Sequence, residues 1–342
     1  MKERSSPIVT TASPPQPGPH RTATPVGVGT AHAKTILIGE HAVVYGAPAI
    51  ALPVHGVTTR AELHPGPAWS LNCDLYRGSV DDAPPAVAPV ITAWRQAVRQ
   101  VTAARPAGTE PTGYSAVTGR LGVASEIPMQ RGLGSSAAVA AAVVDAVTAA
   151  SGVPLGLPER TELVQQAEMI AHGRASGIDT AAVLSDVPIL FEQGSIAPVT
   201  LGARFVFVVA DTGVTGSTAT AVAGVRALRE AHPALVNRLI GQLSELAEVS
   251  LGCLRQGDVS TLGAAMDEAH GALNELGVGS DELNQLVDAA RKAGALGAKL
   301  TGGGLGGCIV ALSRADEVDR LRYELQRAGS HGTWTTTLEG PE

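Results

Sequence analysis

Apolar positions in the first half of the chain follow two different periods. Residues 35–38 and 49–59 are rich in branched apolar side chains and flank the turn residues 46–48, which predicts a strand, a polar loop and a returning strand. Residues 84–104 place apolar side chains three and four positions apart, which predicts a helix. Further elements are expected as a strand over 114–123, a helix through the alanine-rich run to residue 150, and a helix over 158–172 that ends at Gly173.

The pattern changes near Leu201. Residues 205–211 form an apolar run that predicts a buried strand, and helical periodicity follows between residues 217 and 294. We expect further strands over 298–301, 308–312 and 333–338, with a helix over 315–328. Strands and helices alternate without a strict βαβ repeat, so the predicted class is α+β rather than a doubly wound sheet. The expected domains are 25–200, which would bind nucleotide and substrate, and 201–342.

Length and composition limit the class of protein. A chain of 342 residues, 44% hydrophobic and 17% charged, is long enough for two domains with substantial cores. Residues 1–24 are rich in Ser, Thr and Pro and lack the apolar core of a signal peptide, so we expect a disordered tail. The longest apolar run, 137–144, is far shorter than the ~20 residues that a membrane span requires, so no membrane partner is expected.

Charge and cysteine content narrow the partners. A net charge of −7 argues against a nucleic-acid partner and favours a small molecule. Cys73, Cys253 and Cys308 are widely spaced and form no Cys-x-x-Cys pair, which fits a reducing cytoplasm. The histidines form no His-x-x-x-His or Glu-x-x-His pattern, so structural zinc is not expected from the sequence.

The segment 132–138, Gly-Leu-Gly-Ser-Ser-Ala-Ala, is the most informative part of the chain. Glycines allow the backbone to approach a ligand, and the start of the following helix offers unpaired N–H groups to an anion such as phosphate. The alternative is a serine-capped surface helix. Neither the Gly-x-x-x-x-Gly-Lys-Ser/Thr loop nor a dinucleotide fingerprint is present, so a nucleotide would have to bind in another geometry.

Two further segments carry candidate chemistry. In residues 33–46, Lys34 lies in an apolar stretch, and Glu40 and His41 follow in a turn where side chains can converge on a ligand. Lys34 could also be an ordinary strand-edge cation. Glu168 lies near a predicted helix C-terminus, which disfavours an anion and therefore suggests a compensating cation such as magnesium. Asp179 is expected to begin a helix, either as an ionised proton acceptor or as a plain cap.

These segments, together with the glycine-rich segment 299–308, resemble the GHMP kinase superfamily. Segment 33–51, with its Gly-Glu-His-Ala-Val-Val-Tyr-Gly, is most similar to the mevalonate kinase family, as are segments 172–179 and 211–218. The resemblance covers residues 31–312. It implies a two-domain GHMP kinase fold, with a ribosomal-protein-S5-like N-terminal domain and a ferredoxin-like C-terminal domain.

The resemblance also implies a reaction and its residues. Asp179 would take the proton from the C5 hydroxyl of mevalonate as this oxygen attacks the γ-phosphorus of ATP, and Lys34 would keep Asp179 ionised. Ser136 and Glu168 would hold Mg²⁺. The ATP phosphates would lie on the segment Arg131, Gly132, Leu133, Gly134, Ser135, Ser136 and Ala137, and the substrate near Glu40, His41, Thr218 and Gly303. For the side chain of Arg131 two placements remain open, beside the phosphates or toward solvent.

Three alternatives remain at this point. They are a phosphomevalonate kinase, which would need extra cations for a phosphorylated substrate, another small-molecule kinase of the superfamily, and a catalytically silent sensor with the same fold. A cytoplasmic location fits the resemblance. A homodimer is compatible with it, although no residue here indicates one.

Overall fold

The computed structural model describes residues 26–105, 117–173 and 177–340. The predicted tail, residues 1–24, and the start of the strand predicted at 114 lie outside these ranges. Within them, no helix combines the length and apolar character that a membrane crossing requires.

The first of two sheets is built around a long antiparallel pair, β1 (Gly27–Ile38) and β2 (Ala49–Pro65). Its path runs β4-β3-β5-β2-β6-β7, with β1 paired to β2, and all pairs are antiparallel except β3 with β5. The shorter strands are β3 (Ser70–Cys73), β4 (Tyr76–Ser79), β5 (Gly119–Ser125), β6 (Ile189–Glu192) and β7 (Ser195–Pro198). The predicted polar loop between β1 and β2 contains a short 3₁₀ turn, η1 (Ala42–Tyr45).

Four helices accompany this sheet: α1 (Ala88–Ala103), α2 (Ser135–Ser151), α3 (Leu157–His172) and α4 (Ile178–Val183). Two more 3₁₀ turns, η2 (Val80–Asp82) and η3 (Pro85–Val87), precede α1. Alanine dominates the buried face of α2, and glycines on β1 let the helix approach closely. A Cβ added at Gly29 would lie 2.0 Å from the carbonyl oxygen of Ala142. Small side chains on both elements therefore bring the middle and the end of α2 close to β1.

The second sheet has the order β11-β8-β10-β9, and its pairs are antiparallel. Its strands are β8 (Phe205–Asp211), β9 (Gly297–Thr301), β10 (Cys308–Ser313) and β11 (Gly332–Leu338). The helices of this part of the chain are α5 (Thr218–Ala231), α6 (Pro233–Gln256), α7 (Val259–Glu275), α8 (Asp281–Lys292) and α9 (Val318–Arg327). The predicted α+β class is confirmed, and the helix predicted at 315–328 begins later, at Val318.

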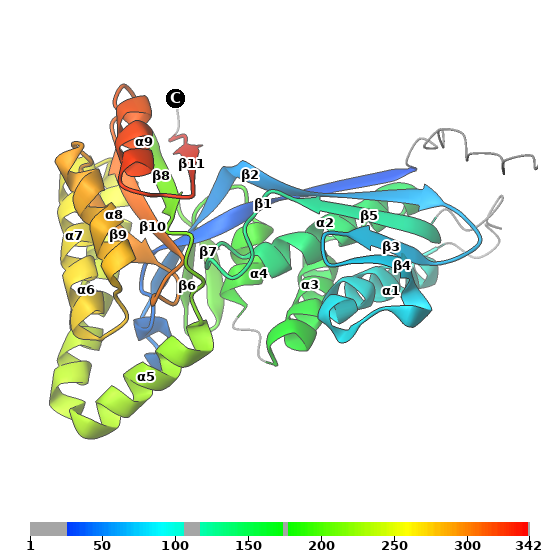
Figure 1. Ribbon diagram of the computed structural model, residues 1–342, viewed down its shortest axis with the longest axis horizontal. Coiled ribbons are helices and arrows are strands. Elements are labelled where there is room, and N and C mark those ends of the chain that lie inside the picture. The colour runs from blue at the N-terminus through cyan, green and yellow to red at the C-terminus, as the bar shows by residue number, and fades with distance from the viewer. Residues whose placement is uncertain (1–25, 106–116, 174–176, 341–342) are drawn as a thin grey trace, which may run out of the picture.

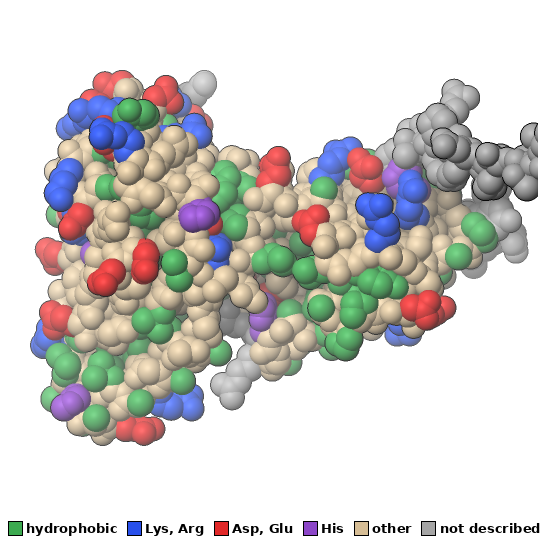
Figure 2. All heavy atoms as spheres, viewed as in Figure 1, with side chains coloured by type: hydrophobic (Ala, Val, Ile, Leu, Met, Phe, Trp, Pro, Cys, Tyr) green, Lys and Arg blue, Asp and Glu red, His purple; other side chains and the backbone are tan. Residues whose placement is uncertain are grey.

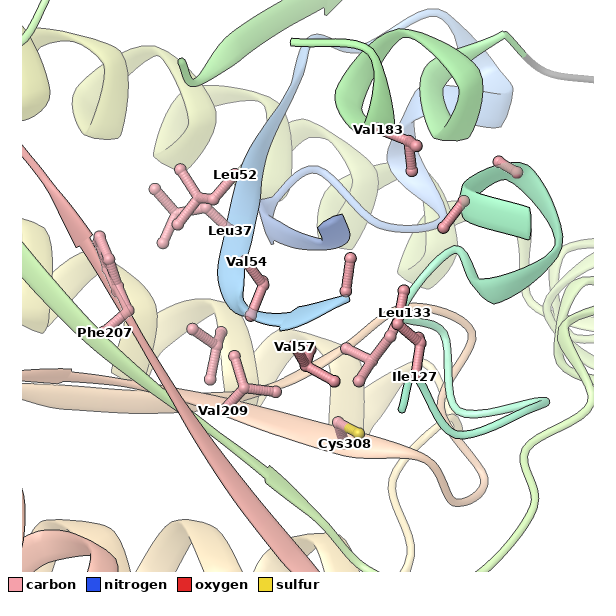
Figure 3. Close-up of a cluster of buried hydrophobic side chains, with 14 of the residues drawn as sticks. Leu37, Leu52, Val54, Val57, Ile127, Leu133, Val183, Phe207, Val209 and Cys308 are labelled. Atoms are coloured by element: carbon pink, nitrogen blue, oxygen red, sulfur yellow. The ribbon is translucent and has the colours of Figure 1, made fainter. Parts of the chain in front are cut away.

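The two sheets meet at one end of β1 and β2, beside β8 and β10 (Figure 1). Leu37 and Leu52 of the first sheet face Phe207 of the second in one continuous buried cluster (Figure 3). At the same junction the hydroxyl of Thr336 in β11 donates a hydrogen bond of 3.0 Å to the carbonyl of Pro53 in β2. The hydrophobic core therefore continues through the junction of the two sheets. On the outer surface, Figure 2 shows Lys and Arg interspersed with Asp and Glu on the face in view.

Candidate active site

The segments singled out in the sequence converge where the two sheets meet. The backbone N–H of Lys34 on β1 donates a 3.0 Å hydrogen bond to the carbonyl of Leu133 in the glycine-rich segment before α2. The hydroxyl of Thr301, at the end of β9, lies 2.9 Å from the carbonyl oxygen of Ile36 and 3.0 Å from its backbone nitrogen. These bonds fix both glycine-rich loops against the same strand.

Lys34 and Asp179 form an ion pair across this junction. The Nζ atom of Lys34 lies 3.0 Å from Oδ1 of Asp179 and donates a further hydrogen bond of 2.9 Å to the carbonyl of Gly132. Asp179 is in the first turn of α4, where the helix dipole favours an anion. The Lys34 side chain is 4% exposed and that of Asp179 is 38% exposed. The carboxylate is therefore accessible to a small molecule, while the cation behind it is held in place.

Glu168 is a buried carboxylate near the C-terminus of α3. Burial raises its pKa, and nearby Asp179 adds to this shift, whereas a hydrogen bond from Ser136 opposes it. Its Oε1 atom is buried without a hydrogen-bond partner among the described residues, and Oε2 lies 3.9 Å from Nε2 of His172. A hydroxyl and a carboxylate with an unpaired oxygen are the hard donors that Mg²⁺ prefers. The residues present thus fit this ion.

The start of α2 has the features of an anion cradle. Its N-cap is Gly134, with φ +71°, and no side chain in the described part of the chain caps the helix. Because neither Ser135 nor Ser136 acts as the cap and much of the helix is buried, the alternative of a serine-capped surface helix is wrong. Open N–H groups in the first turn can donate hydrogen bonds to a phosphate. A Cβ at Gly134 would lie 2.8 Å from Cγ of Lys34, so glycine is required here for a second reason.

Of the two predicted placements of the Arg131 side chain, the structure excludes the one toward solvent. Its Nε lies 2.9 Å from Oδ1 of Asp211, at the end of β8, and its Nη2 donates a 2.8 Å hydrogen bond to the carbonyl of Gly213. The side chain is 14% exposed, so the solvent placement is wrong. The guanidinium instead ties the glycine-rich segment before α2 to the second sheet.

Glu40 and His41 are both buried and both bonded to the second glycine-rich segment. The Glu40 carboxylate forms an ion pair with Lys299 of β9, and the side chains of both residues are almost completely buried. Burial raises the pKa of Glu40 and lowers that of Lys299, and the attraction between the charges opposes both shifts. The Nε2 atom of His41 lies 2.9 Å from the carbonyl oxygen of Gly303, and burial lowers the pKa of this imidazole. A neutral His41 that donates from Nε2 satisfies both observations.

Lys299 was missed as a functional candidate by sequence reasoning, although it stands in the third motif. The available signal was its surroundings, because lysine is rare in this chain and Lys299 occurs within the apolar run of a buried strand. A lysine there requires a carboxylate partner. What could not be deduced is that the partner is Glu40, 259 residues earlier in the chain.

Thr218 begins α5 and lies against Gly303. A Cβ at Gly303 would lie 2.7 Å from Oγ1 of Thr218, so any side chain at position 303 would clash with this threonine. Thr218 is exposed, and its neighbour Gly303 also carries the carbonyl that contacts His41. These three predicted substrate residues therefore form one contact series.

The site thus contains a solvent-accessible aspartate, Asp179, beside the buried ammonium of Lys34. It also contains a carboxylate suited to a cation, Glu168, and the N-terminus of α2, which is suited to an anion. Phosphoryl transfer passes through a loose transition state, for which an enzyme chiefly positions the reactants and neutralises charge. Each of these groups is chemically suited to one of those two tasks.

Comparison with known proteins gives the same picture. The model of the GHMP kinases N terminal domain matches residues 95–186, and that of the GHMP kinases C terminal matches residues 250–331. A mevalonate kinase of Pyrococcus horikoshii is 36% identical over 306 residues, which cover 84% of this chain and 88% of the relative.

Solved structures agree. A crystal structure of L. major mevalonate kinase in complex with R-mevalonate superimposes with a TM-score of 0.77, at 27% identity, and covers 93% of this chain and 98% of that one. The mevalonate kinase from Staphylococcus aureus MRSA252 gives a TM-score of 0.69 at 31% identity, covering 93% of this chain and all of that one, 100%. The likeness therefore extends over both sheets.

Proposed function

The chain belongs to the mevalonate kinase family of the GHMP kinases, and we propose that its site phosphorylates the C5 hydroxyl of mevalonate with Mg-ATP. It is an ATP-dependent phosphotransferase of the mevalonate pathway that acts on an alcohol group. The observation that carries the proposal is the ion pair between Lys34 and Asp179, which lies where the three sequence motifs meet. Its two charged atoms are 3.0 Å apart, the lysine is buried, and the aspartate is partly exposed.

In this mechanism Asp179 accepts the proton of the C5 hydroxyl. The freed oxygen forms a bond to the γ-phosphorus of ATP as the bond from that phosphorus to the β-γ bridging oxygen breaks, and ADP leaves. The ammonium of Lys34, 3.0 Å from Asp179, holds this carboxylate in place and stabilises charge that develops on the attacking oxygen. A strong base is unnecessary because the transition state is loose.

ATP would bind on the segment 131–137, with its phosphates toward the open N–H groups of α2. Ser136 and Glu168 would hold Mg²⁺, which when bound neutralises charge on the phosphates. The partnerless Oε1 of Glu168 supports this part of the proposal. Removal of either group, by Ser136→Ala or Glu168→Gln, should raise the Mg²⁺ concentration needed for half-maximal turnover, and a Mg²⁺ titration of each variant measures this.

A phosphomevalonate kinase is disfavoured by the cations of the site. Each has a carboxylate partner: Lys34 pairs with Asp179, Lys299 with Glu40 and Arg131 with Asp211. A phosphorylated substrate would require a further cation for its own phosphate. Among the described residues of this site these ion pairs leave no such cation. The unphosphorylated alcohol is the better fit.

The decisive experiment measures ADP release with Mg-ATP and, separately, mevalonate, phosphomevalonate, galactose and homoserine. We expect turnover on mevalonate alone, and a fall in kcat of at least about 100-fold in Asp179→Asn with nearly unchanged ATP binding. Asp316→Asn, on an exposed residue, is the matched control. Turnover on another substrate would overturn the specificity, near-normal turnover in Asp179→Asn would remove Asp179 from the mechanism, and silence on all substrates would favour a sensor.

We also propose that residues 25–200 and 201–342 act as separate domains, which would place the boundary between β7 and β8. The reducing cytoplasm suggested by composition is compatible with the free thiols of Cys73, Cys253 and Cys308. A homodimer stays a prediction from the resemblance.

A further inference from the structure

Two histidines and an aspartate, distant in sequence, meet beside the junction of the sheets. His32 lies on β1, His55 on β2, and Asp186 in the segment between α4 and β6. The imidazole rings of His32 and His55 are 4.8 Å apart between centroids and meet edge to face. Nε2 of His32 lies 3.8 Å from Oδ1 of Asp186, and one ligand atom of each residue lies within 4.8 Å of the others.

A hydrogen bond fixes the tautomer of His32. Its Nδ1 atom lies 2.7 Å from the carbonyl oxygen of Ala33, and because a carbonyl can only accept, Nδ1 carries the proton. In the neutral ring the lone pair is then on Nε2. This atom is buried and has no hydrogen-bond partner among the described residues. A histidine that donates one ring N–H to a backbone carbonyl and presents the other nitrogen is the usual form of a metal ligand.

An irregularity in the β1–β2 pair creates the cluster. Thr58 pairs with His32, but Val54 pairs with the next residue, Ala33, so residues 55–57 of β2 bulge out of the register. A bulge re-aims side chains, and it is this one that carries His55. Sequence spacing could not reveal the cluster, because the bulge and not a local motif brings the ligands together.

The bulge is held by the second sheet. The backbone N–H of His55 lies 3.4 Å from the hydroxyl oxygen of Thr336 on β11, and a Cβ at Gly56 would lie 2.4 Å from the carbonyl oxygen of Thr335. His55 and Asp186 are exposed, so an ion could enter and could complete its coordination with water. Only His32, the oriented ligand, is largely shielded, with a side chain 10% exposed.

We propose that His32, His55 and Asp186 bind a divalent transition-metal ion, for which Zn²⁺ is the best match. Two imidazole nitrogens and a carboxylate oxygen are ligands of Zn²⁺, whereas Mg²⁺ prefers the all-oxygen donors at Ser136 and Glu168. Zn²⁺ bonds of about 2.0–2.2 Å need ligand atoms about 3.3 Å apart. The ligand atoms lie within 4.8 Å of one another here, so binding would require the exposed Asp186 and His55 side chains to move closer to His32.

The bound ion would fasten the segment after α4 to β1 and β2. α4 carries Asp179 at its start, and Asp186 follows its end after a short segment. β1 carries Lys34 two residues beyond His32. The ion would therefore brace, from outside the site, the two elements that bring the catalytic pair together.

The test is a Zn²⁺ titration against a chromophoric chelator, without nucleotide and with excess Mg²⁺ to occupy the oxygen site. Wild-type protein and the control His232→Gln, which alters an exposed histidine outside the cluster, should bind one ion tightly. His55→Gln and Asp186→Asn should each weaken this binding by at least about tenfold, since loss of even an outer-shell partner costs that much. Both substitutions alter exposed side chains, and circular dichroism checks that each variant is folded.

Two further readouts separate this site from others. Zn²⁺ should raise the melting temperature of wild-type protein but not of His55→Gln or Asp186→Asn. Co²⁺ in its place should give the visible absorption of a four-coordinate ion, lost in the same variants. The proposal is overturned if wild-type protein binds no Zn²⁺, or if its affinity and stoichiometry are the same in both variants, which would locate the ion elsewhere.

Discussion

The buried pair between Lys299 and Glu40 gives a sharp prediction for stability. Lys299→Met keeps the length and apolar stem of the side chain but removes the ammonium, so the main change is a carboxylate left without its partner. The Glu40 side chain is 2% exposed, and burial already raises its pKa in the intact pair. We expect Glu40 to become protonated in the folded variant at neutral pH, because an unpaired buried charge costs more than protonation.

The size of the effect follows from this protonation. Glu40 ionises near its ordinary pKa of 4.5 in the unfolded chain, so holding it neutral at pH 7 costs about 3 kcal/mol at about 1.4 kcal/mol per pH unit. The folded pKa is raised, so the contribution of Glu40 is fully present below pH 4.5 and is lost as pH rises above it. Because the raised pKa of Glu40 in the intact pair already carries part of this cost in wild type, the variant should be less stable than wild type by up to about 3 kcal/mol at pH 7 and by at most about 1 kcal/mol at pH 5.

Urea unfolding at the two pH values measures both numbers. Lys292→Met, which alters an exposed lysine at the end of α8, should be nearly neutral at both. The double variant Glu40→Gln/Lys299→Met should recover much of the loss at pH 7, since neither charge remains. The reasoning is refuted if Lys299→Met costs less than about 1 kcal/mol at pH 7, or if its cost is the same at pH 5.

Two further predictions concern His270, on α7, and Gly134, the N-cap of α2. Burial lowers the pKa of His270 to about 4 from 6.5, so its contribution to stability is present above pH 6.5 and is lost as pH falls toward 4. His270→Gln should therefore remove about 2 to 3 kcal/mol of the stability loss between pH 8 and pH 4.5, and unchanged acid sensitivity in urea unfolding would argue against this role of His270. Gly134→Ala should lower both stability and kcat, because its Cβ displaces Lys34, whereas Gly152→Ala, with a similar positive φ and an open surrounding, should cost stability alone. Equal kcat in the two glycine variants would contradict the clash.

Local sequence patterns were sufficient to predict a large part of the fold and of the candidate site. Residues 205–211 were predicted as a buried strand and form β8 with those bounds, because an uninterrupted apolar run has few other solutions. Lys34 and Asp179 were paired through the resemblance, and the structure brings their charges to 3.0 Å. In these cases the deciding information lies within one segment or one motif.

Other features depend on contacts that no single segment encodes. The pairing of Glu40 with Lys299 was not predicted, since it exists only once β9 lies beside β1. The pairing of Arg131 with Asp211, on the other sheet, was not predicted either. The hairpin of β6 and β7 was also missed, since its strands are short and only partly buried.

The junction also explains why the glycines of the two loops cannot be replaced independently. A Cβ at Gly132 would lie 3.5 Å from the Cα of Gly302, and one at Gly307 would lie 3.0 Å from the carbonyl oxygen of Arg131. The loops therefore pack backbone to backbone, and Gly132 is at the same time the acceptor for Lys34. The same glycine therefore connects the packing of the two loops with the position of the Lys34 ammonium. A substitution that separates the loops is expected to disturb the Lys34–Asp179 ion pair as well, so the stability of the junction and the geometry of the proposed catalytic pair depend on the same contacts.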